Sequence, residues 1–329
     1  MTVLKQLWFQ FEPSVKQQWR ELLVAGQLVP DEQVDYTVGI YDGSQLIGTG
    51  SLYQNIIKCV AIDPAATQQN LLAPLIKALL DQLTETQYEA AFVYTKPKTA
   101  PYFEAMGFKV IVTTAEVSLL EWGYPNFDDY QAYLRRHKRP SDNAAAIVMN
   151  ANPFTLGHQY LIEQALKSSD VVYVFVVSED RSQFKTATRL AMVRRAVAIN
   201  QRVVVLETNH YLVSNATFPA YFLKDQANLA VAKTQACLDA TLFLTKIKPV
   251  LAIQQRFVGA EPDSPVTQIY NDQMAQVFAD QLPLTVVPRL QQAGRPISAT
   301  TVRQALAVGD WATVAQQVPP INKQFLKGS

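Results

Sequence analysis

Residues 144–158, AAAIVMNANPFTLGH, decide the fold of the second half of this chain. Ala144–Met149 is an apolar run of strand length, a loop follows it, and a helix is expected to continue to about Lys167. Further helices are expected over Ala216–Ile247 and after Pro265 and Ala299. The other expected strands are also nearly continuous apolar runs: Val171–Val177, Val203–Leu206, Ala252–Val258 and Leu284–Val287. Such strands, alternating with helices, indicate an α/β fold with a parallel sheet covered on both faces.

The first half follows a different pattern. Asp42-Gly43 is a strong turn signal between apolar runs, so Thr37–Tyr41 and Gln45–Tyr53 are predicted to form a hairpin. The remaining expected elements are strands at Ile56–Ile62, Ala90–Tyr94 and a long Phe108–Leu120, with helices at Asn70–Leu83 and Thr99–Met106. The pattern restarts at Ala144, which predicts an N-terminal domain over 1–130, a connector over 131–143 and a second domain over 144–329.

Composition narrows the function classes. The chain has 329 residues and is 49% hydrophobic, which suits two domains with their own cores. Lys plus Arg is 29 and Asp plus Glu is 28, and this balance argues against nucleic acid as the partner. The sequence offers no apolar run long enough for a membrane span and no signal peptide. Cys59 and Cys237 are expected to be free thiols in a reducing cytoplasm.

The loop of the quoted segment carries the strongest chemical signal. Ligands of open α/β sheets bind at the carboxyl ends of the strands, and a helix N-terminus offers free backbone N–H groups to an anion. Gly157 lets a phosphate approach the backbone, and His158 can donate a hydrogen bond or a positive charge. The alternative is an ordinary loop-to-helix turn. The expected contacts come from the loop residues Asn150, Ala151, Asn152, Phe154 and Thr155 together with Gly157 and His158.

A second helix start lies near the C-terminus, in Gly294–Arg303. Ser298 or Thr300 can cap the helix, and Arg303 lies one turn into it, where its guanidinium can meet the same anion. Two anion-binding helix starts in one α/β domain suit a triphosphate and its departing pyrophosphate. The alternative is a capped structural helix.

Together these motifs resemble the nucleotidylyltransferase superfamily. Thr155–His158 matches its (H/T)xGH loop, with Thr where many members have His, and Ile297–Arg303 matches its ISxTxxR segment. This resemblance implies a Rossmann-like catalytic domain. Four segments, in order, are similar to the citrate (pro-3S)-lyase ligase family: Asn152–His158, Phe175–Asp180, Ala216–Lys224 and Phe257–Pro262.

The family resemblance implies an ATP-dependent acid–thiol ligase. Acetate would attack the α-phosphorus of ATP, giving acetyl-AMP and pyrophosphate, and a thiol would then take the acetyl group and release AMP. The thiol would belong to the phosphoribosyl-dephospho-CoA arm on the acyl-carrier subunit of citrate lyase. The alternative function is a small-molecule adenylyltransferase that moves AMP to a phosphate ester.

This chemistry assigns roles to the candidate residues. His158 would stabilise charge at the α-phosphate, and Thr155 would itself donate a hydrogen bond to the α-phosphate. Mg²⁺ would accompany ATP without a dedicated metal cage. His210 would reach the acyl site or be a surface histidine. The other assignments are Ser298, Thr300 and Arg303 to the β- and γ-phosphates, Lys185 and Arg189 to phosphate contacts or the surface, and Glu261 to ribose, a metal-bound water or a structural turn.

The N-terminal half resembles a GNAT acetyltransferase, through the order of its elements and through Pro101–Phe108. That fold holds acyl-CoA pyrophosphate on a glycine-bearing loop, but the corresponding loop here, Ala66–Ala73, contains no glycine. We therefore predict that this domain does not bind acetyl-CoA and recognises the partner protein or its CoA-like arm instead.

Overall fold

The computed structural model describes residues 2–66, 70–180, 182–214, 229–261 and 264–327. The chain divides into two compact units, residues 1–127 and 128–329. The predicted motif Ala216–Lys224, residues 67–69 of the glycine-free loop and Pro262 lie outside the described residues.

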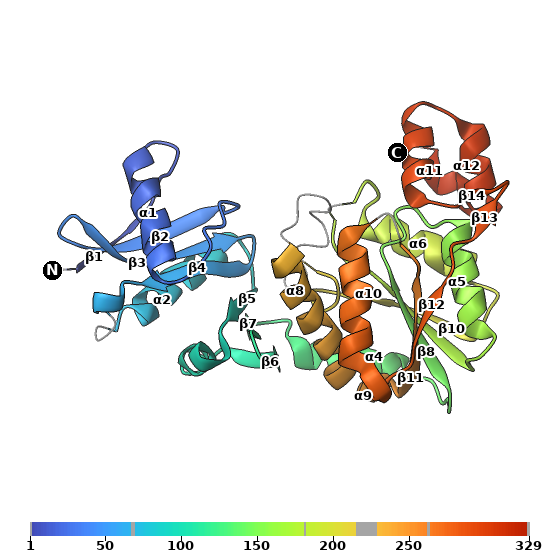
Figure 1. The fold of residues 1–329 in the computed structure, drawn as a ribbon, viewed down its shortest axis with the longest axis horizontal. Coiled ribbons are helices and arrows are strands. Elements are labelled where there is room, and N and C mark those ends of the chain that lie inside the picture. Colours follow the sequence, from blue (N-terminus) through green and yellow to red (C-terminus); the bar gives the residue numbers. More distant parts are fainter. Residues whose placement is uncertain (1, 67–69, 181, 215–228, 262–263, 328–329) are drawn as a thin grey trace. The chain divides into compact units, whose positions relative to one another are not determined.

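The first unit is built on a seven-stranded sheet in the order β1-β2-β3-β4-β5-β7-β6 (Figure 1). Neighbouring strands are antiparallel except for the parallel pair β4 and β5. The strands are β1 Thr2–Gln6, β2 Tyr36–Asp42, β3 Gln45–Tyr53, β4 Ile56–Ile62, β5 Ala90–Thr95, β6 Lys109–Thr113 and β7 Ser118–Gly123. The helices are α1 Pro13–Ala25, α2 Leu72–Glu85 and α3 Ala100–Glu104, with short 3₁₀ turns at Pro64–Ala66 and Pro97–Thr99.

The predicted hairpin is confirmed, and Gly43 takes the left-handed conformation that its turn needs, with φ of 59°. The prediction of a single long strand over Phe108–Leu120 is wrong. The polar residues at its centre form a turn, in which the Thr114 N–H donates to the Val117 carbonyl at 2.8 Å, and β6 and β7 pair on either side. The sequence analysis also gave no element for β1 or α1.

The second unit contains the predicted parallel sheet, with five strands in the order β10-β9-β8-β11-β12. The strands are β8 Ala144–Met149, β9 Val171–Val176, β10 Val203–Glu207, β11 Ile253–Gly259 and β12 Leu284–Val287. The helices around them are α4 Phe127–His137, α5 Leu156–Leu166, α6 Thr186–Ala196, α8 Leu229–Leu242, α9 Lys248–Leu251, α10 Pro265–Phe278, α11 Ala299–Ala307 and α12 Trp311–Gln317. β8 is the central strand, so the loop that follows it leaves from the middle of the sheet.

Alternating residues of the strands face two separate cores. Val172, Val174 and Val176 of β9 pack in one cluster with residues of α5, α6 and α11. Phe175 points the other way, and its ring meets Phe243, which in turn contacts Phe278 of α10. The sheet is therefore buried on both faces, which explains why its strands are nearly continuous apolar runs.

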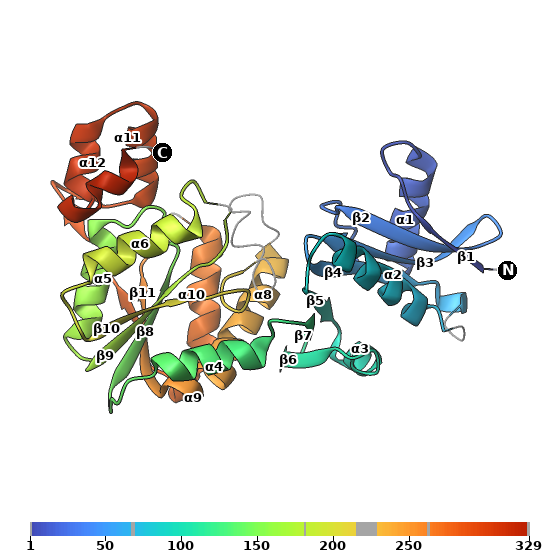
Figure 2. The same cartoon turned by 180° about the vertical axis from the view of Figure 1, so that it is seen from behind.

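The helical region after β10 is interrupted near its end. In the described part of the predicted helix Ala216–Ile247, α8 passes into a π-helical turn, Phe243–Ile247, and then into α9. Ala252 follows with φ of 54° and returns the chain to β11. Figure 2 shows the same unit from behind, with α11 and α12 together near the C-terminus. The short two-stranded sheet of β13 Gln291–Gln292 and β14 Arg295–Pro296 leads into α11.

α4 is anchored on the second unit. The Tyr130 hydroxyl donates to the Glu207 carbonyl at 3.0 Å, and the Gln131 amide donates to the Lys246 carbonyl at 3.2 Å. Tyr130 is buried. This helix therefore ties the end of β10 to the π-helical turn.

Candidate active site

The loop after β8 fixes the orientation and the tautomer of His158. Thr155 is the extended N-cap residue of α5, and its backbone N–H donates to His158 Nδ1 at 3.0 Å. Thr155 Oγ1 lies 2.9 Å from the same nitrogen. Because Nδ1 accepts, the proton of a neutral imidazole resides on Nε2. The ring thus presents an N–H donor from the first turn of α5.

The surroundings of the ring keep it neutral. Phe154 is fully buried and stacks on His158, with ring centroids 5.6 Å apart. Burial lowers the pKa of His158 from 6.5 to about 4. Of the two roles predicted for His158, the structure supports the hydrogen-bond donor and not the positive charge.

This low pKa makes stability depend on pH. The unfolded chain protonates its imidazole near pH 6.5, whereas the folded chain does so only near pH 4. As pH falls between these values the unfolded state binds more protons than the folded state, so the free energy of unfolding decreases progressively. We expect wild type to lose about 2 kcal/mol more unfolding free energy than His158→Gln between pH 7 and pH 5. Denaturant unfolding of both proteins at each pH measures this, and equal losses would contradict it.

The two predicted phosphate motifs meet. A Cβ added at Gly157 would lie 3.6 Å from Ile297 Cγ2 and 3.7 Å from the Ile297 carbonyl. Arg303 Nη1 donates to the Asn152 carbonyl at 2.5 Å, which clamps α11 to the loop after β8. Both distances at Gly157 are ordinary contacts, so the protein itself does not require a glycine there. Access for a ligand remains our explanation for it.

The start of α11 is capped as predicted. Ser298 Oγ accepts from the Thr300 N–H at 3.2 Å, and Thr300 Oγ1 accepts from Arg303 Nη2 at 2.9 Å. Arg303 is half-buried, and desolvation lowers its pKa slightly without removing its charge. Its guanidinium has five N–H donors and uses two on these described partners, which leaves donors for an anion.

Backbone donors of the loop are available as well. Ala151 and Phe154 are fully buried and Asn152 is nearly so. Their backbone N–H groups make no hydrogen bond within the described ranges. Buried backbone donors are almost always paired, so three unpaired ones in one loop point to an anion that completes them.

The side chains of the loop have structural partners instead. Asn150 Oδ1 accepts from Arg189 Nη1 at 3.0 Å, and Asn152 Oδ1 accepts from the Phe184 N–H at 3.1 Å. Ala151 has φ of 50°, a left-handed conformation that turns the chain sharply after β8. The two asparagine side chains and the conformation of Ala151 therefore shape the loop.

The contacts of Arg189 favour a structural role over the phosphate contact or surface position that the sequence predicted. Its side chain is fully buried, and all three of its nitrogens donate to the protein. Nε donates to the Phe184 carbonyl at 2.9 Å, and Nη2 donates to the Glu179 carbonyl at 2.7 Å. Nη1 donates to the carbonyls of Asn150 at 2.9 Å and Val177 at 2.5 Å. Arg189 thus ties the loop after β8 to the turn after β9.

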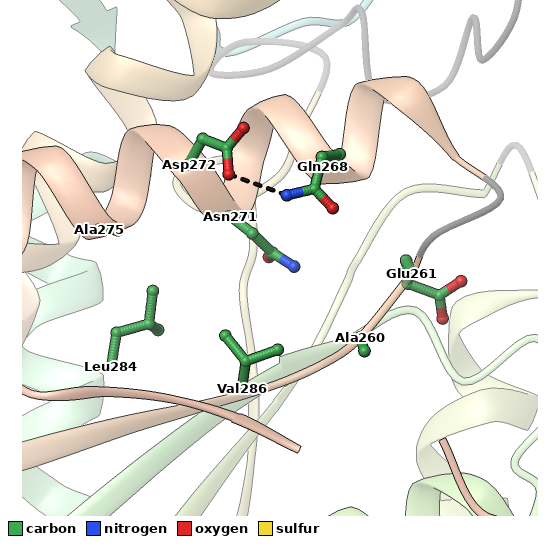
Figure 3. A pocket seen from close by; sticks show the side chains of 8 residues that line it. All are labelled: Ala260, Glu261, Gln268, Asn271, Asp272, Ala275, Leu284 and Val286. Atoms are coloured by element: carbon green, nitrogen blue, oxygen red, sulfur yellow. Dashed lines mark hydrogen bonds between the residues drawn. The ribbon is translucent and has the colours of Figure 1, made fainter. Parts of the chain in front are cut away.

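The remaining candidates, Lys185 and Glu261, precede α6 and follow β11. Lys185 is exposed at the start of α6. Glu261 accepts from Arg289 Nη2 at 2.5 Å, and its carboxylate borders a pocket of about 230 Å³ between α10 and β12. Figure 3 shows that this carboxylate points away from Asn271 and Val286. The ion pair favours the structural alternative for Glu261.

The sequence analysis missed a buried polar network on the other face of the sheet. Asp239 of α8 accepts from the Tyr270 hydroxyl at 2.6 Å and from the Val213 N–H at 2.8 Å. Arg256 is buried beside them, with its guanidinium 4.7 Å over the Phe243 ring. Charged residues inside apolar strands and helices were the available signal. The network holds the segment after β10 against α8.

Two features are absent from the described ranges. No group of three or more His, Cys, Asp or Glu side chains gathers there as a metal cluster. No helix in these ranges is both long and apolar enough to cross a membrane. Cys59 and Cys237 are both free thiols, as predicted.

Two solved structures are similar to parts of the chain at low sequence identity. One is the ribosomal-protein-S18-alanine N-acetyltransferase from Escherichia coli, at 13% identity and a TM-score of 0.31, covering 39% of this chain and 99% of that one. The other is Thermotoga maritima TmcAL bound with alpha-thio ATP, at 14% identity and a TM-score of 0.39, covering 56% of this chain and 55% of that one.

Sequence relatives are much closer. The family described as citrate lyase ligase C-terminal domain matches residues 144–326. A citrate (pro-3S)-lyase ligase from Haemophilus influenzae is 38% identical and covers 90% of each chain. The Klebsiella pneumoniae protein of that name is 36% identical over 86% of this chain and 84% of its own. The Escherichia coli K12 protein is 33% identical over 93% and 89%. The chain therefore belongs to the citrate (pro-3S)-lyase ligase family.

Proposed function

We propose that this protein activates citrate lyase by acetylating the thiol of its acyl-carrier subunit. Acetate attacks the α-phosphorus of ATP, the bond to the β-phosphate oxygen breaks, and pyrophosphate leaves. The thiol sulfur then attacks the acyl carbon of acetyl-AMP, and AMP departs with the electron pair of the broken C–O bond. The acceptor is the phosphoribosyl-dephospho-CoA arm of the carrier.

The backbone N–H groups of Ala151, Asn152 and Phe154, which have no hydrogen-bond partner among the described residues, carry this proposal. Together with the His158 Nε2–H and the remaining donors of Arg303, they offer hydrogen bonds to an anion from two helix starts. Negative charge develops on the phosphoryl oxygens as pyrophosphate leaves, so fixed donors lower the barrier more than a general base would. Thr155 has the contacts of a positioning residue, because its backbone and hydroxyl both meet His158 Nδ1.

Mg²⁺ enters with ATP in this proposal. It would be held mainly by the phosphates and by water, as is usual for nucleotide sites that lack a dedicated carboxylate cage. The reaction would take place in the cytoplasm, where reducing conditions keep the acceptor thiol free.

The N-terminal domain, residues 1–130, would recognise the carrier or its arm. β4 and β5 pair only at Ile56 with Phe92 and at Ile57 with Val93, although both strands continue. In the described ranges the ladder between β4 and β5 is therefore limited to these two residue pairs. An extended arm that contains amides suits a strand with so short a ladder, because its backbone can pair with the strand.

The first experiment is acetate-dependent exchange of labelled pyrophosphate into ATP, with Mg²⁺ and without carrier. We expect exchange that requires acetate, because the adenylation site is formed within residues of one unit. A parallel assay adds deacetylated citrate lyase, which tests whether the carrier must complete the site. Absence of exchange in both assays, with ATP binding confirmed, would favour transfer of AMP to a phosphate ester instead.

A further inference from the structure

The turn after β10 presents a histidine at the same edge of the sheet as the His158 loop. β8, β9 and β10 are adjacent parallel strands, so their carboxyl ends lie side by side. Neighbouring strands are about 4.8 Å apart, which puts the ends of β8 and β10 about 10 Å apart. His210 lies three residues beyond the end of β10.

Hydrogen bonds link the two loops through the turn after β9. Arg189 donates to carbonyls on both the β8 and the β9 side, at Asn150 and Glu179. Ser178 then continues to the β10 side, because its Oγ accepts from the Asn209 N–H at 2.9 Å and its N–H donates to Thr208 Oγ1 at 2.9 Å. These hydrogen bonds therefore connect the turn that carries His210 to the loop after β8.

The segment Thr208–Ser214 is held rigidly around this histidine. Tyr211 stacks on Tyr130 of α4, with centroids 4.9 Å apart, and the Val213 N–H donates to Asp239 of α8. Val213 has φ of 46°, a strained conformation for a β-branched residue that its surroundings must stabilise. Within this segment Asn209 is half-buried, the other neighbours are buried, and His210 alone is exposed.

We propose that His210 takes the proton of the carrier thiol as the sulfur attacks acetyl-AMP. This inference rests on the proposed function and adds a group for its second step. The S–H bond breaks, a ring nitrogen of His210 receives the proton, and the sulfur electron pair forms the bond to the acyl carbon. AMP then leaves as its phosphate takes the electrons of the C–O bond, and the imidazolium loses its proton to solvent.

The charges around the turn suit a base. Desolvation by the protein around it lowers the pKa of His210, and the carboxylate of Glu179 opposes this shift. A lowered pKa favours the neutral ring near pH 7, which is the form that a base needs. Titratable and charged groups on the elements around the turn include Glu179 after β9, Glu207 of β10 with its partner Arg194, Tyr211, Tyr130 and Tyr133 of α4, and Asp239 of α8.

The test separates the two half-reactions in His210→Gln. We expect acetate-dependent pyrophosphate exchange to stay within about twofold of wild type, which also shows that the variant folds. Acetyl transfer to deacetylated citrate lyase should fall about 10²-fold at pH 7. The deficit should shrink as pH rises toward the pKa of a free thiol, about 8.5, because the thiolate then forms without a base.

His137→Gln is the matched control, because His137 is exposed at the end of α4 and its Nδ1 lies 2.9 Å from the Tyr133 carbonyl. We expect both half-reactions to be unchanged in it. Wild-type transfer rates in His210→Gln, or a deficit that is equal at every pH, would overturn the role of His210 as base. Absence of exchange in the wild type would instead contradict the proposed adenylation.

Discussion

Replacing His158 with alanine should lower the rate of acetate-dependent pyrophosphate exchange by about 10²–10³-fold. The change removes the Nε2–H donor. In the wild type, the Thr155 N–H donates to Nδ1 and so keeps the ring proton on Nε2. A donor already aimed at the phosphoryl oxygens needs no reorganisation when charge develops on them. The loss should therefore appear in the exchange rate at saturating ATP, with a smaller change in the affinity for ATP.

Two further measurements make this test specific. His158→Gln retains a side-chain acceptor for the Thr155 N–H, as glutamine does at this position of a capping box. It should therefore start α5 normally and still exchange more slowly than wild type. Wild-type exchange should also show no titration of His158 between pH 5.5 and 8, because its pKa is about 4. Near-wild-type exchange in the alanine variant would exclude His158 as the donor.

The sequence predicted the secondary structure around the candidate site well and the contacts that support it poorly. The apolar run Ala144–Met149 and the glycine-histidine pair after it define a strand, a loop and a helix start by local pattern alone, and the structure has all three. The neutral state of His158 depends on the Phe154 ring and on burial, which arise only when the sheet is assembled.

Arg189 illustrates the same limit from the opposite side. An arginine after a strand end has the chemistry of a phosphate ligand, and the sequence interpretation of Arg189 rested on that chemistry. Its neighbours Leu190, Met192 and Val193 all pack in the core, and this apolar setting was the local signal for a buried guanidinium. The predicted single strand Phe108–Leu120 shows the same limit. Polar residues at its centre form a turn, and that turn depends on the pairing of β6 with β7.

Arg189→Ala should reduce the unfolding free energy by about 4 kcal/mol, because several buried acceptors lose their donor at once. The carbonyls of Phe184, Val177, Glu179 and Asn150 all accept from this one guanidinium. Arg189→Lys should recover little of the loss, since a single ammonium group cannot reach all the acceptors on the two loops, after β8 and after β9. Denaturant unfolding at pH 7 measures each variant.

Arg195→Ala is the matched control, because Arg195 is exposed on the same helix and should cost less than about 0.5 kcal/mol. The comparison also decides between the two interpretations of Arg189. If Arg189 is a structural clamp, Arg189→Ala lowers stability even in the absence of ATP. Pyrophosphate exchange then fails because the loop after β8 loses its shape. A phosphate ligand would leave the stability of Arg189→Ala equal to that of Arg195→Ala and weaken only the binding of ATP. Fully occupied donors on a fully buried side chain make the first outcome the expected one.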